Sequence, residues 1–122
     1  MTLRDIRLNV TTIADQSGSA TATVPVFGYL EAVDWIDGDL VDGVDAVLSV
    51  TNTPSGVDHT LLTLTNADAD AMYYPRRVVD TTAGAAAAGV YDRFIVDGVL
   101  KLAVTSGGAS KTGGCVVYIA TD

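Results

Sequence analysis

Five closely spaced aspartates are the first candidates for metal chemistry in this sequence of 122 residues. They are Asp34, Asp37, Asp39, Asp42 and Asp45. Carboxylate oxygens are ligands that Ca²⁺ prefers, but aspartate side chains also accept hydrogen bonds from backbone amides in turns. Gly38 and Gly43 stand between these aspartates and are typical of a solvated loop. We therefore expect turn-capping side chains here and no metal site.

A second acidic stretch, Asn66–Ala67–Asp68–Ala69–Asp70, is similar to the first half of a helix–loop–helix calcium loop. Such a loop needs glycine at its sixth position, for a sharp turn, and a bidentate glutamate at its twelfth. Ala71 and Arg77 occupy those positions. The pattern therefore excludes this type of calcium site.

Nucleophilic catalysis would depend on His59 and Cys115, the single histidine and the single cysteine. Cys115 follows two glycines and precedes an apolar strand, so no helix N-terminus is expected to lower the pKa of its thiol. The stretch Gly107–Thr112 lacks the residue order of a phosphate-binding loop and a following helix. We expect a buried structural cysteine, no catalytic residue, no cofactor and no enzymatic activity.

Arginines beside tyrosines form a different kind of candidate site. Arg76 and Arg77 follow Tyr73 and Tyr74 closely, and both residue types are enriched at the centres of protein interfaces. Cation–π packing within one exposed strand accounts for the same pattern equally well. Phe27 and Trp35 are added to these four because of their residue type. The candidate contact residues are thus Phe27, Trp35, Tyr73, Tyr74, Arg76 and Arg77.

The elements that carry these residues are predicted to be strands. Fourteen of the fifteen acidic residues are Asp, which favours turns, and Val and Thr, which favour strands, are abundant. Alternating segments such as Val44–Asn52 and His59–Thr65 are separated by turn residues at intervals of about 8–12 residues. We predict a single all-β domain over residues 1–122, an antiparallel β-sandwich or barrel of about seven to eight short strands.

The sequence also makes three local predictions about turns and strands. The dipeptide Asp97–Gly98 predicts a two-residue hairpin between strands Val90–Val96 and Val99–Thr105. The alanine-rich stretch Thr82–Gly89 predicts a mobile loop or a short helix, because eight residues are marginal for an unaided helix. Cys115–Ala120 predicts a final, almost entirely apolar strand.

Charge and hydropathy narrow the possible partners. The formal net charge is −8, which disfavours nucleic acid, because phosphate contacts need clustered Lys and Arg. No apolar run approaches the length of about 20 residues that a membrane helix needs, and Met1–Val10 has no signal-peptide pattern. We expect no nucleic-acid and no membrane partner. One cysteine also excludes an internal disulfide.

A resemblance to a known class extends over the last two-thirds of the chain. It is carried by Thr51–Asp58, Leu61–Thr65, Tyr73–Arg77, Asp80–Gly84 and Gly98–Val104. These segments resemble small structural proteins of tailed bacteriophages. The resemblance implies a non-enzymatic virion component that assembles in the host cytoplasm. Its partners are then copies of itself and other virion proteins, such as the major capsid protein or the connector.

Acidity favours a position outside the DNA-filled capsid, so a decoration protein on the outer surface is the leading expectation. A head–tail connector or a collar component is the alternative.

A carbohydrate-binding β-sandwich module remains a rival, with Tyr29, Trp35, Tyr73 and Tyr74 as its aromatic platform. An enzyme is a weaker rival and requires His59, or the convergence of Asp34, Asp39 and Asp42, at a cleft.

Overall fold

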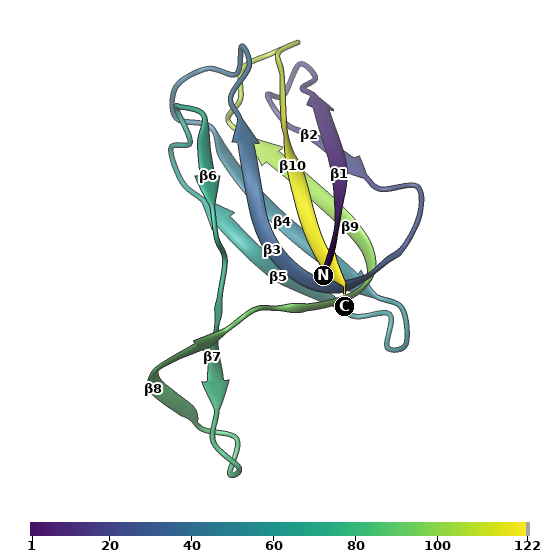
Figure 1. Cartoon of the computed structure of the whole chain (residues 1–122). Helices are drawn as coiled ribbons and strands as arrows, with labels where there is room; N and C mark the ends of the chain where they lie inside the picture. Colours follow the sequence, from purple (N-terminus) through teal and green to yellow (C-terminus); the bar gives the residue numbers. More distant parts are fainter. Residues whose placement is uncertain (122) are drawn as a thin grey trace.

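The computed structural model describes residues 1–121, which form ten strands and no helix (Figure 1). No helix in this part of the chain could therefore cross a membrane. The strands are β1 (Thr2–Thr11), β2 (Gly18–Thr21), β3 (Val26–Ile36), β4 (Asp45–Asn52), β5 (Asp58–Leu64), β6 (Ala71–Tyr73), β7 (Arg77–Asp80), β8 (Ala86–Asp92), β9 (Ile95–Thr105) and β10 (Thr112–Thr121). The prediction of an all-β fold is confirmed.

Eight strands form one antiparallel sheet that divides into two layers. Residues Val26–Tyr29 of β3 pair with β9, whereas Val33–Trp35 of β3 pair with β6 instead. One layer is thus β6-β3-β10-β1 and the other is β2-β9-β4-β5, joined where β3 meets β9. The arrangement is sandwich-like and open. β1 pairs with β10 of its own chain from Thr2 to Thr11.

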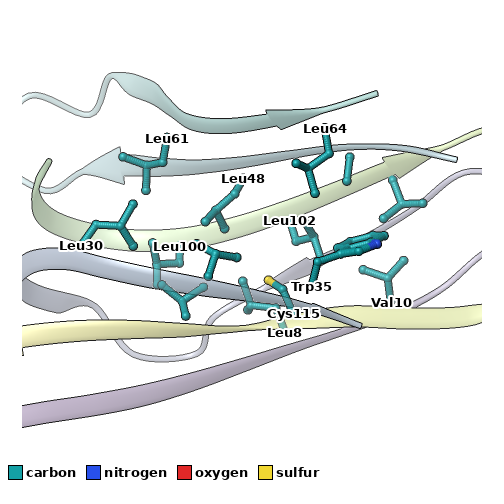
Figure 2. Close-up of a cluster of buried hydrophobic side chains, with 14 of the residues drawn as sticks. Leu8, Val10, Leu30, Trp35, Leu48, Leu61, Leu64, Leu100, Leu102 and Cys115 are labelled. Atoms are coloured by element: carbon teal, nitrogen blue, oxygen red, sulfur yellow. The ribbon is translucent and has the colours of Figure 1, made fainter. Parts of the chain in front are cut away.

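The core lies between the two layers (Figure 2). Leu48, Leu100 and Leu102 point into it from one layer, and Leu8 and Leu30 from the other. Each of these side chains is at most 2% exposed. Full burial of a leucine stabilises a fold by roughly 1.5–3 kcal/mol, and alternating strand residues supply this burial because successive side chains point to opposite faces.

The hairpin predicted at Asp97–Gly98 is wrong. β9 runs without interruption from Ile95 to Thr105, and Gly98 pairs with Val26 of β3 on one side and Asn52 of β4 on the other. A β-carbon at Gly98 would collide with the carbonyl oxygen of Thr51. The glycine therefore serves a close approach between strands, and pairing on both sides holds the dipeptide extended.

The prediction for the alanine-rich stretch Thr82–Gly89 is only half right, because residues 82–85 form a turn but Ala86–Gly89 belong to a strand. Ala86–Asp92 forms β8, which pairs with β7 in a separate two-stranded sheet. The Thr81 amide donates a hydrogen bond to the Ala85 carbonyl at 2.6 Å and closes the turn. This hairpin, residues 77–92, extends away from the sandwich (Figure 1). We call it the hairpin arm.

Candidate interaction surface

Exposed apolar side chains gather where the hairpin arm leaves the sandwich. Val26, Gly28 and Leu30 of β3 face the core, so Phe27 and Tyr29 face outward. Ile95 of β9 lies directly opposite Tyr29 in the strand pairing and so shares its face. Phe27 is 68% exposed and Ile95 66% exposed. We call this region, with the charged residues Glu31, Arg76 and Arg93 beside it, the arm-root surface.

Glu31 organises the charges of the arm-root surface. The pairing of β3 with β10 skips Glu31, which is the extra residue of a β-bulge between Leu30 and Ala32. A bulge turns a side chain away from the regular alternation, and the Glu31 carboxylate lies 3.6 Å from Arg76 and 3.1 Å from Arg93. Two guanidinium groups thus face one carboxylate. Asp97, which lies directly opposite Phe27 in the strand pairing, adds a second carboxylate to this face.

The arginines also hold backbone and aromatic groups. Arg76 donates hydrogen bonds to the carbonyl oxygens of Glu31, at 3.2 Å, and Pro75, at 2.9 Å. The Arg93 guanidinium lies 4.4 Å from the centre of the Tyr29 ring, a cation–π contact. Partly exposed ion pairs stabilise a fold by only about 0–1 kcal/mol. The arrangement therefore fixes the shape of a surface more than it stabilises the core.

Five of the six predicted contact residues keep some exposure. Phe27 and Tyr74 are largely exposed, and Arg76 and Arg77 lie on the surface, Arg77 forming an ion pair with Asp80 of the arm at 3.3 Å. Tyr73 is half-buried and packs against the core. Only Phe27 and Arg76 belong to the arm-root surface, while Tyr74 and Arg77 lie close to it in sequence.

Trp35 was placed wrongly among the contact residues. It is fully buried, and its indole Nε1 donates a hydrogen bond to the Ala67 carbonyl at 3.1 Å. Strict alternation from Leu30 would point Trp35 outward, but the bulge at Glu31 reverses the phase and turns it into the core. The residues missed by sequence reasoning, Glu31, Arg93 and Ile95, meet only through long-range strand pairing, which no local signal reveals.

The predicted aromatic platform for sugars is not assembled. Trp35 is buried in the core, Tyr73 is half-buried, and the Tyr29 ring carries the Arg93 guanidinium on one face. Sugar rings stack on open aromatic faces, and these four residues offer no shared one.

Of the five aspartates predicted to cap turns, Asp39 and Asp45 accept hydrogen bonds from backbone amides, but these amides belong to distant segments and not to the aspartate's own turn. Asp39 accepts from the Thr112 amide, Asp45 from the Asn66 amide at 3.0 Å, and Asp68 from the Gly43 amide at 2.7 Å. The hydrogen bond from Thr112 lowers the pKa of Asp39 below its ordinary value. In residues 1–121, no group of three metal-ligating side chains comes together.

His59 and Cys115 do not form a nucleophilic pair. His59 is exposed on β5, in one layer, and Cys115 is buried on β10, in the other. Burial, followed by the nearby Asp34 carboxylate, raises the pKa of the Cys115 thiol to about 12. The thiol is therefore protonated at neutral pH, and the prediction of a buried cysteine is confirmed.

No family model matches this chain, and no curated protein matches it in sequence. Among solved structures, it is similar to a chain of the virus-like particle of the extra small virus of the giant freshwater prawn, Macrobrachium rosenbergii, at 13% identity. The match covers 99% of this chain and 80% of that chain, with a TM-score of 0.31. A TM-score this low does not establish a shared fold, and nothing about the function of this chain follows from it.

Proposed function

We propose that this chain is a non-enzymatic structural protein of a virus particle, which acts by binding copies of itself and neighbouring virion proteins. The observation that carries the proposal is the combination of the arm-root surface and the protruding arm. Phe27, Tyr74, Tyr91 and Ile95 are each more than 60% exposed. Exposed apolar clusters flanked by arginine are typical of protein interfaces.

The outside of a tailed-phage capsid is the proposed location, with the major capsid protein as the second partner. The resemblance of Thr51–Gly84 to phage structural proteins supports this placement, as does the net charge of −8, because packaged DNA repels an acidic protein. Assembly would take place in the host cytoplasm. A specific contact of this kind buries about 1,600 Å² between partners.

A head–tail connector or collar subunit is the second candidate, and the position of the hairpin arm favours it. The arm extends from one side of the sandwich (Figure 1). A contact made by different surfaces on the two partners generates a closed ring when the rotation closes. The two candidates differ in copy number, because a decoration protein covers the shell and a connector forms one ring per particle.

The double variant Arg76→Ala, Arg77→Ala tests the proposed function. Its fold should persist, since both arginines form only partly exposed ion pairs. Its occupancy on purified particles, measured by quantitative mass spectrometry, should fall by about tenfold or more, since interface arginines often contribute 2 kcal/mol or more.

The matched control is Lys101→Ala, Lys111→Ala, which removes the same charge from positions away from the arm-root surface. This control should load normally. Equal occupancy of both double variants would refute the role of the two arginines. A chain that binds neither particles nor itself would refute the proposed function.

A further inference from the structure

The hairpin arm lacks a packing partner within residues 1–121. β7 and β8 pair with each other and have no more than marginal contact with the other strands. Val90 is 50% exposed and Tyr91 62% exposed. An isolated two-stranded hairpin is marginally stable in water, so a further surface is needed to hold the arm in this form.

An open groove of about 350 Å³ lies along β1. β1 is the edge strand of the layer β6-β3-β10-β1, at the edge opposite β6. Its walls are Arg4–Asn9 of β1 and the segment Ala20–Val24. The two walls converge at Gly18, where a β-carbon would lie 2.8 Å from the Thr11 carbonyl oxygen, and they do not pair with each other. We call this the edge groove.

The edge groove offers both backbone and apolar contacts. β1 pairs with β10 along one edge, and within the described chain no strand pairs with its other edge. The partly buried side chains of Ile6, Ala20 and Ala22 pack against the core at its floor. A free edge with an apolar floor is the type of site that accepts an added strand.

We propose that the hairpin arm of one copy docks in the edge groove of a second copy, where an arm strand pairs with the free edge of β1. This inference rests on the proposed function, because it specifies how the subunits associate.

Side-chain size and charge support this occupant. The arm strand β8 and its turn carry four consecutive alanines, Ala85–Ala88, whose small side chains allow the arm backbone to approach β1 closely. The groove walls carry Arg4 and Arg7 and one carboxylate, Asp5, and neither arginine forms an ion pair with any residue from 1 to 121. The arm carries the exposed carboxylates of Asp80 and Asp92, of which Asp80 already forms an ion pair with Arg77 of the arm. The groove walls therefore carry one excess positive charge and the arm carries one excess negative charge, so the two surfaces are complementary.

The geometry favours a second copy over the arm's own subunit. The arm follows β6, at one edge of the layer β6-β3-β10-β1, and the groove flanks β1 at the opposite edge. β3 and β10 lie between them, and the arm extends away from the sandwich (Figure 1). Each copy would thus give its arm to one neighbour and receive an arm from another.

Disulfide trapping between two separately purified variants tests the proposal. One variant carries Ala88→Cys in the arm and the other Thr23→Cys in the groove wall; both positions are exposed. The native Cys115 is buried and should not react. The control partner is Thr63→Cys, exposed on β5 in the other layer. Trp35 fluorescence checks that each variant is folded.

After mixing and mild oxidation, the Ala88→Cys and Thr23→Cys chains should form a mixed disulfide dimer. Its yield should exceed that with Thr63→Cys by about tenfold or more, since docked cysteines have effective concentrations in the millimolar range. Equal yields with both partners would overturn the arm contact. If the mixture is oligomeric and still shows equal yields, the proposed function stands without this contact. If the arm instead cross-links only to the major capsid protein in particles, the occupant is not a second copy and the inference fails.

Discussion

At the scale of single residues, Asp37 differs from the other loop aspartates because its surroundings oppose its charge. Its Oδ1 is buried and has no hydrogen-bond partner among the described residues. Burial, followed by the carboxylates of Asp70, Asp68 and Asp42, raises the pKa of Asp37 above its ordinary value of 3.8. The folded protein therefore binds this proton more tightly than the unfolded chain, and the ionised carboxylate costs stability at neutral pH.

Replacing Asp37 with Asn should therefore raise the melting temperature at pH 7, because the neutral amide avoids the repulsion. The gain should shrink as the pH falls through the folded pKa and vanish below about 3.8, where the native carboxyl is also neutral. Asp5→Asn, which removes the same charge from exposed β1, is the control. A variant that is less stable than the native chain at pH 7 would contradict this account.

Residue roles that depend on the local sequence could be predicted. Cys115 is buried in an apolar strand as expected. Asp39 and Asp45, by contrast, accept hydrogen bonds from the amides of Thr112 and Asn66, which are distant in the sequence, so local turn context does not indicate their partners. Trp35 could not be placed, because its orientation depends on the bulge at Glu31. That bulge arises from the pairing of β3 with β10, which follows from the whole sheet and not from the neighbouring residues.

At the scale of elements, β9 joins the two layers. Its first residues pair with β3, and the rest pair with β4 on one edge and β2 on the other. Gly98 stands at the change of partner, against the Thr51 carbonyl. Asp–Gly is a strong local signal for a turn, but pairing on both sides outweighs it here.

Gly98→Ala should destabilise the fold by roughly 2–4 kcal/mol, because β9 and β4 must separate to admit the new methyl group. Chemical denaturation followed by Trp35 fluorescence measures the loss. Gly56→Ala is the control: its φ of 70° also disfavours a side chain, but its β-carbon would meet no atom within 4 Å. The control should cost only about 1 kcal/mol. Equal costs for the two variants would show that the contact with Thr51 does not matter.

Alternation predicted most strands but not the hairpin arm. Val44–Asn52 was recognised because alternate residues of β4 are apolar and buried. His59–Thr65 was recognised as a strand, but a bulge at Leu61 breaks the alternation and buries Leu61 together with Leu64. The alanine-rich segment has no such contrast between faces, and every residue of β8 except Ala87 is exposed. Its strand form follows from pairing with β7, so composition alone favoured a loop or helix.

At the scale of the whole molecule, charge and shape favour association. The chain carries −8 overall, yet arginines cluster at the arm-root surface and along the edge groove. The arm and the groove lie at opposite edges of one layer. Sequence patterns predicted the sheet but not which exposed residues gather into one surface, because these surfaces combine strands that are distant in the chain.

The mass of the purified chain in solution, by native mass spectrometry or analytical ultracentrifugation, tests the central claim most directly. The full chain should form a closed oligomer, and a variant with Thr81–Ala88 replaced by a short Gly–Ser turn should be a folded monomer with native Trp35 fluorescence. A trimer, pentamer, hexamer or dodecamer would each point to a different symmetric location on a particle. A full chain that stays monomeric at every concentration, and on particles binds no neighbour, would contradict the account.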